Sequence, residues 1–426
     1  MKQARSLERL PPEIQLLILS DSSSLRDLYA AIRCSPRLYH VFLANRELVL
    51  VEVVRKTMPL EILPDVAAAL RAMHTVPKGA VPSLDDILSF MHDYTASIQE
   101  HERSHHQSLL QPSWAIALCR LERVVKAMIE DMCQRALPAL MSFRWRAPDE
   151  SGSVPAPLVC DESDLPLSRV EEIRLRRAFY RFETYSRLFH GSVTGTAGQH
   201  VGRKQAELFL ARFPLWQVEE LACVRHHLLI RLGEAFDDLE DDFVASELDG
   251  EREVVDRRDV DLPCPDLPSG GYDCNLLRRW EGKDYFFSHS GKFDIHSRAM
   301  EFVLSLGIGY VHDVLLHPER RTLAELVHRP PDDHQQWYAR GDFLSAALGA
   351  VPLIFPDAAN DHAVAFQAHG ETSFCGDRPD EPNQAWCFEP YFIHLRGPQS
   401  FDGLRAWGHV FWDSARLREA GILIEE

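Results

Sequence analysis

The segment LPPEIQLLIL (residues 10–19) decides how the first part of the chain folds, together with SLRDLYAAIRC (24–34) and SPRLYHVFLA (35–44). Apolar residues recur three or four positions apart in each segment, which is the spacing of an α-helix. The prolines near the start of the first segment suit the first turn of a helix, where the missing N–H leaves no bond unmade. The polar run DSSS (21–24) and the pair Ser35-Pro36 separate the segments. We therefore predict a compact module of three short helices over residues 6–50.

These segments resemble the F-box, in the diverged form common in filamentous fungi. The F-box pattern is Leu-Pro-x-Glu, an aliphatic first helix, a polar gap, Asp-Leu on the second helix, and a cysteine or small residue before the third helix. All of these parts occur here in that order. The resemblance implies a module that docks on the adaptor Skp1, which connects it to a cullin ubiquitin ligase. One departure is that the third segment lacks the tryptophan found there in many F-boxes.

The resemblance also implies which residues form the adaptor-binding face or the core that supports it. Such a small helical module leaves an apolar patch uncovered, and an exposed apolar patch marks a protein interface. The implied residues are Leu10, Pro11, Ile14, Leu17, Ile18, Leu25, Leu28, Ile32, Leu38 and Tyr39. The alternative is a helical cap that packs on the rest of the chain and has no adaptor surface.

The remainder of the chain predicts a larger, irregular helical domain with a loop-rich region towards its end, so the fold class is mostly α. We expect a helical region over 51–145, a linker or loop over 146–168 and a helical body over 169–426. Within the body, residues 170–189 (VEEIRLRRAFYRFETYSRLF) predict a helix whose arginines form a solvated face opposite Ile173, Leu175, Phe179 and Phe182.

Four further segments of the body have their own patterns. An acidic run followed by prolines predicts a loop over 237–272, and residues 295–316 predict one long apolar helix in which Gly307 and Gly309 mark close helix packing. Residues 350–400 predict loops or short strands. Residues 403–420 predict a packed aromatic helix with Trp407, Phe411 and Trp412. Two segments, RAFYRF (177–182) and WGHVFWD (407–413), are similar to segments of large fungal families that have no assigned chemistry.

Composition narrows the classes of function. The net charge of -18 among 426 residues argues against a general nucleic-acid binder, which usually has a basic surface. No stretch approaches the roughly 18 apolar residues of a membrane helix, and the start lacks the apolar region of a secretory signal. The nine cysteines include no C-x-x-C pair and fit reduced thiols. We therefore expect a protein of the cytoplasm or nucleus, without membrane or nucleic-acid partners.

Catalytic and metal motifs are weak. Asp237-Asp238-Leu239-Glu240-Asp241 fits the Asp-Asp-x-x-Asp pattern with which isoprenoid synthases hold Mg²⁺, but the second metal motif of that family is missing. His226 and His227 are adjacent, so their side chains would point about 100° apart on a helix and are poorly placed to bind one metal ion together. No Walker A, Gly-x-Gly-x-x-Gly or His-Glu-x-x-His motif occurs. We expect no metal, no cofactor and no catalytic residues of its own.

The expected function is therefore the substrate-receptor subunit of a Skp1-cullin-F-box ubiquitin ligase. The body would bind an unknown protein substrate, through the concavity between its long helices or through the 350–400 region. The alternative is an interaction or scaffold protein that keeps the F-box-like fold without the ligase connection. A more distant alternative is a Mg-dependent helical enzyme that uses the Asp237–Asp241 cluster.

Overall fold

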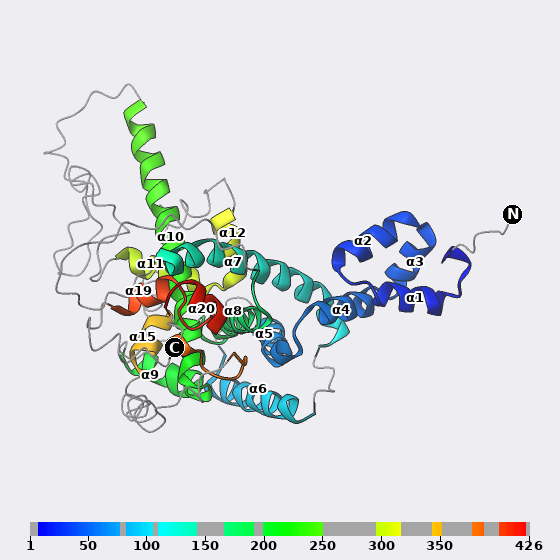
Figure 1. Ribbon diagram of the computed structural model, residues 1–426, viewed down its shortest axis with the longest axis horizontal. Coiled ribbons are helices and arrows are strands. Elements are labelled where there is room, and N and C mark those ends of the chain that lie inside the picture. The colour runs from blue at the N-terminus through cyan, green and yellow to red at the C-terminus, as the bar shows by residue number, and fades with distance from the viewer. Residues whose placement is uncertain are drawn as a thin grey trace, which may run out of the picture.

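The computed structural model describes residues 7–76, 82–104, 110–142, 166–190, 199–249, 295–316, 343–351, 377–386 and 400–422. Helices dominate these ranges and none of their residues forms a strand, which confirms the mostly α fold. No helix within them is long and apolar enough to cross a membrane. Most of the expected linker (146–168), loop residues 250–272, and most of the 350–400 region lie outside the described residues. Figure 1 shows a large helical body with a smaller helical lobe at the N-terminal end.

The lobe contains the three helices expected from the first segments. They are α1 (Pro12–Ser20), α2 (Leu25–Cys34) and α3 (Pro36–Ala44), preceded by the short η1 (Leu7–Arg9). The Ser24 hydroxyl accepts the backbone N–H of Asp27, and the Ser35 hydroxyl accepts that of Leu38, so each serine caps the helix that follows it. A small core of its own holds the lobe together: Leu19, Leu28, Leu38, Phe42, Val49 and Val53.

Helix α4 (Arg46–Thr57) joins the lobe to the body. Its residues Val49 and Val53 belong to the core of the lobe, whereas Val51 and Val54 belong to the core of the body. The same helix packs against η3 (Pro112–Trp114) and α7 (Ala115–Ser142). Because one helix is buried in both cores and crosses the expected boundary at residue 50, the lobe is fixed to the body by packing as well as by the chain.

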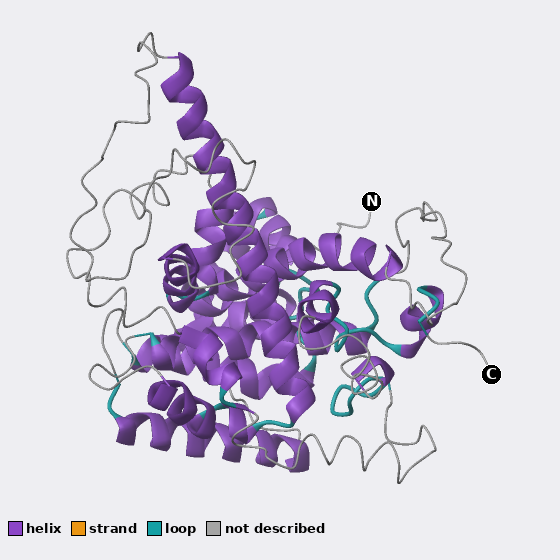
Figure 2. Ribbon diagram, turned by 90° about the vertical axis from the view of Figure 1, so that its left-hand side faces the viewer, coloured by secondary structure: helices purple, strands orange, loops and turns teal. Residues whose placement is uncertain are grey.

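The body is built around α8 (Arg169–Phe189), which packs against helices from both earlier and later parts of the chain. Figure 2, turned from Figure 1, shows these helices gathered into one mass. One continuous apolar core runs through it. Its remaining helices are η2 (Leu60–Ile62), α5 (Leu63–Thr75), α6 (Leu84–Ser104), α9 (Gln199–Leu208), η4 (Leu210–Arg212), α10 (Leu215–Asp249), α11 (Ile295–Ser305), α12 (Ile308–Leu316), α15 (Phe343–Gly349), α19 (Ser400–Ala406) and α20 (Ser414–Glu419).

Four arginines in the middle of α8 are buried, so the expected solvated face was wrong. Arg174, Arg176, Arg177 and Arg181 are each 6 % exposed or less. Each one has polar partners on other elements, as a buried cation requires. The partners are Asp65 for Arg181, Glu220 for Arg177, Glu122 for Arg176, and the backbone carbonyl oxygens of residues 378 and 381 for Arg174.

The acidic run does not begin as a loop. Helix α10 continues through it to Asp249, and Figure 1 shows its last turns in green, projecting from the body. No glycine or proline occurs between Gly233 and Gly250, so nothing in the sequence interrupts the helix. The expectation of a loop over 237–249 was therefore wrong.

The apolar segment 295–316 forms two helices instead of one. Gly307 has φ +91°, a left-handed conformation that interrupts the helix between α11 and α12. The carboxylate of Glu183 on α8 accepts the backbone N–H of Ile308 at 2.8 Å and so caps the start of α12. Gly307 therefore marks a helix break, with Glu183 packed against it.

The C-terminal segment 403–420 is likewise not one helix. Helix α19 ends at Ala406, residues 407–413 form a turn in which Gly408 has φ +64°, and α20 begins after Asp413, whose side chain accepts the N–H of Arg416. The aromatic packing was expected correctly, because Trp407, Phe411 and Trp412 are each 1 % exposed or less. The sequence pattern identified the apolar residues and missed the break at Gly408.

Candidate functional site

Helix α1 presents an exposed apolar face. Ile14, Leu17 and Ile18 are 42, 65 and 37 % exposed and share one side of the helix at spacings of three and four residues. The opposite side is anchored by Leu19 in the lobe core and by Gln15, whose amide donates to the carbonyl of Leu7 at 3.0 Å. The face therefore consists of side chains that the lobe itself does not cover.

The ten residues implied by the F-box resemblance divide into three groups. Pro11, Ile14, Leu17, Ile18 and Tyr39 are exposed. Leu28 and Leu38 are buried in the core of the lobe, and Leu10, Leu25 and Ile32 are half-buried. The first group could contact the adaptor directly, while the residues of the other two groups mainly support the shape of the lobe.

Three further large apolar residues, one each on η1, α2 and α3, are exposed and were not among those ten. Leu7, Tyr29 and Leu43 are 54, 57 and 48 % exposed. Leu43 lies one helical turn after Tyr39 on α3, so the spacing of four residues could have identified it. Leu7 precedes the first apolar segment, and no helical pattern includes it.

Two hollows lie along α7. One encloses about 320 Å³ between α2, α4 and α7, with apolar walls that include Leu28, Ile32 and Phe42. The other encloses about 500 Å³ between α7, α8 and α12. Arg120 and Arg123 line both hollows. Both arginines are exposed, and no ion pair joins either of them to a residue in the described ranges.

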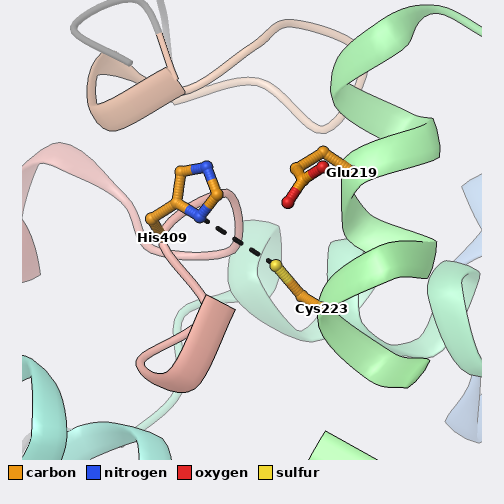
Figure 3. Close-up of side chains that lie close together, drawn as sticks. All are labelled: Glu219, Cys223 and His409. Carbon is orange, nitrogen blue, oxygen red and sulfur yellow. Dashed lines mark hydrogen bonds between the residues drawn. The ribbon is translucent and has the colours of Figure 1, made fainter. Parts of the chain in front are cut away.

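A third feature is a buried cluster of metal-binding side chains, shown in Figure 3. Glu219 and Cys223 lie one turn apart on α10, and His409 lies in the turn after α19. Their ligand atoms are all within 4.8 Å of one another, and all three residues are buried. The spacing Glu-x-x-x-Cys was visible in the sequence, but nothing near His409 indicated that the chain returns to α10.

The other candidates from the sequence do not converge on a site within the described residues. The backbone of Asp237–Asp241 is helical, and the side chains of these residues are outside the description. His227 is buried against Asp131, with its Nε2 atom 3.0 Å from a carboxylate oxygen. Cys34, Cys119, Cys133 and Cys223 form no disulfide bond within the described residues. Burial raises the pKa of the Cys133 thiol to about 12, so this cysteine stays protonated at neutral pH.

Comparisons with protein-family models, curated proteins and solved structures found no match to this chain. Any functional assignment therefore depends on the residues and their geometry.

Proposed function

We propose that the chain is the substrate-receptor subunit of a Skp1-cullin-F-box ubiquitin ligase. The observation that carries the proposal is the uncovered apolar face of α1, formed by Ile14, Leu17 and Ile18. It lies on the segment whose sequence resembles the F-box, and exposed apolar patches of this kind mark protein interfaces. Burying a leucine that is 65 % exposed contributes roughly 1–2 kcal/mol to association.

The way the lobe is attached supports the same role. A receptor acts by positioning its substrate, so a fixed geometry between the adaptor and the substrate is an advantage. Helix α4 is buried in the cores of both lobe and body, and Lys56 near its end pairs with Asp21 after α1 at 2.5 Å. The apolar face of α1 is therefore held in a defined orientation relative to the body.

The body would bind the protein substrate. The hollows beside α7 are concavities between long helices, as this role requires, and they join apolar walls to the exposed Arg120 and Arg123. Such a lining suits a segment that carries apolar and acidic side chains together. In this role the chain performs no bond chemistry of its own.

The test is a binding measurement between the full-length chain and purified Skp1. The double variant Ile14→Asp/Ile18→Asp places two charges on the apolar face, where an unpaired charge in an apolar contact costs about 1–3 kcal/mol or more. We expect the affinity to fall at least about 100-fold. Far-UV circular dichroism should be unchanged, because both side chains are already partly exposed.

A matched control exists on α6. Leu84 and Leu88 are also four residues apart on a helix, and each is 41 % exposed, so Leu84→Asp/Leu88→Asp makes an equivalent change away from the lobe. This control should bind Skp1 as the wild type does. If the folded wild type does not bind, the ligase proposal is wrong and the scaffold alternative takes its place. Equal loss in both variants would show that the α1 face is not the contact.

A further inference from the structure

The cluster of Glu219, Cys223 and His409 brings three metal-binding side chains to one point from two distant parts of the chain. Glu219 and Cys223 are four residues apart on α10, which places them on one face of the helix. His409 comes from the turn after α19, and its Nδ1 atom is 4.0 Å from the sulfur of Cys223. Figure 3 shows the carboxylate, thiol and imidazole facing one another.

The ligand atoms lie within 4.8 Å of one another, so they would have to move closer to bind one metal ion. Zinc–sulfur and zinc–nitrogen bonds of about 2.3 and 2.0 Å at a tetrahedral angle place the two ligand atoms about 3.5 Å apart. The observed separation between the Cys223 sulfur and the His409 Nδ1 atom is 4.0 Å, so these two ligands need to approach by roughly 0.5 Å. Within the described residues no other group of three such side chains converges.

His409 is held in place by its surroundings. The amide of Asn383 donates to the carbonyls of His409 and Trp412, at 2.6 and 2.9 Å. The imidazole packs against Trp386 with ring centroids 6.4 Å apart and against Trp407 at 5.8 Å. Gly408, with φ +64°, allows the backbone turn that directs the next residue inward. A ligand that is already oriented loses little entropy when it binds a metal.

Glu219 is oriented in the same way. Arg405 on α19 donates to both of its carboxylate oxygens, at 2.5 and 2.8 Å. A carboxylate has lone pairs beyond those that two N–H donors use, so it can bind a metal and an arginine together. Outer hydrogen bonds of this type are the usual support of metal ligands.

We propose that Glu219, Cys223 and His409 bind one zinc ion, which fastens the C-terminal turn to α10. A donor set of thiolate, imidazole and carboxylate is typical of zinc, and a water molecule completes the tetrahedron. On binding, the Cys223 thiol releases its proton to solvent and the thiolate bonds to the metal. The site is independent of the adaptor-binding face, because it joins two elements of the body.

The experiment measures metal content and stability on the full-length protein. Protein purified without chelators should contain one zinc ion per chain, as measured by inductively coupled plasma mass spectrometry. The substitution Cys223→Ala or His409→Ala should reduce this zinc content at least tenfold. The matched controls are Cys133→Ala and His227→Ala, which remove the same donors from a half-buried and a buried position outside the cluster. Both controls should keep the full zinc content.

A second measurement separates metal loss from misfolding. A zinc chelator should lower the melting temperature of the wild type and of Cys133→Ala, and should leave that of Cys223→Ala unchanged. Cobalt added to the metal-free wild type should produce a thiolate-to-cobalt absorption band that Cys223→Ala lacks. A wild type with no bound zinc and no cobalt band, or a Cys223→Ala variant that retains its zinc, would overturn the proposal.

Discussion

Gly307 and Gly309 lie two residues apart, and the structure assigns them different roles. Gly307 has φ +91°, and a Cβ atom there would lie 2.6 Å from a carboxylate oxygen of Glu183. Gly307→Ala should lower the free energy of unfolding by about 2 kcal/mol or more, because a left-handed alanine costs about 1–2 kcal/mol and Glu183 would also be displaced from α12. Equilibrium unfolding in urea measures the change.

Gly309 provides the control for this prediction. A Cβ atom at Gly309 meets nothing within 4 Å, and the residue lies inside α12. Gly309→Ala should therefore raise stability, by up to about 1 kcal/mol, since alanine favours a helix more than glycine does. Similar losses at both positions would show that the chain does not turn at Gly307.

Single residues also show which contacts the sequence could not predict. The apolar spacing in α2 predicted Leu28, which lies in the core of the lobe. In α1 the same spacing runs through Ile14, Leu17 and Ile18, which are exposed, so periodicity alone did not identify the inward side. It failed for Arg174 and Arg181, since a buried arginine is stable only with partners from distant segments. Asp65, for example, is 116 positions away from Arg181 along the chain. For the same reason His409 could not be connected with α10.

At the scale of elements, α8 is stabilised by buried ion pairs that can be compared with exposed ones. Arg181 and Asp65 are 2.7 Å apart and nearly inaccessible to solvent, whereas Arg203 and Glu207 on α9 are 2.8 Å apart and about half exposed. Arg181→Met should lower the free energy of unfolding by about 3–5 kcal/mol, because it leaves the Asp65 carboxylate buried without its cation. Thermal or urea unfolding measures the difference.

The exposed pair provides the matched substitution. Arg203→Met makes the same chemical change on a helix surface and should alter stability by no more than about 0.5 kcal/mol. Asp65 also accepts the hydroxyl of Tyr94, and burial together with this carboxylate raises the pKa of Tyr94 well above its usual range. If Arg181→Met were as mild as Arg203→Met, water would have to reach Asp65, and α8 would not be the centre of a closed core.

Helix starts were easier to predict than helix ends. The hydroxyls of Ser24 and Ser83 each accept the backbone N–H of the residue three positions later. Short polar side chains of this type predict the start of a helix from the sequence. The breaks at Gly307 and Gly408 depend on what the chain meets in space. Gly408 is an example, because a Cβ atom there would lie 2.9 Å from the ring of Phe411. A glycine within an apolar pattern does not reveal such a contact in advance.

At the scale of the whole molecule, the two ends of the chain contribute differently to the fold. In Figure 1 the N-terminal helices form the lobe at one end, while α19 and α20 lie within the body. The lobe has its own small core and touches the main core through α4. The C-terminal segment supplies fully buried aromatic side chains to the main core, together with Arg416, whose guanidinium pairs with the buried Glu171 at 2.8 Å.

Truncation from either end should therefore have opposite results. A chain of residues 46–426 loses the lobe but keeps α4 and the main core, so it should unfold cooperatively with a modestly lower melting temperature.

A chain of residues 1–399 loses Trp407, Phe411 and Trp412, each 1 % exposed or less, and removal of a buried aromatic side chain costs about 3–5 kcal/mol. It also leaves Glu171 and Glu219 buried without their arginines. These losses together exceed the roughly 5–15 kcal/mol that stabilises an ordinary domain, so this chain should not fold. Differential scanning calorimetry distinguishes the two, and a cooperative transition in 1–399 would mean that the body folds without its C-terminal helices.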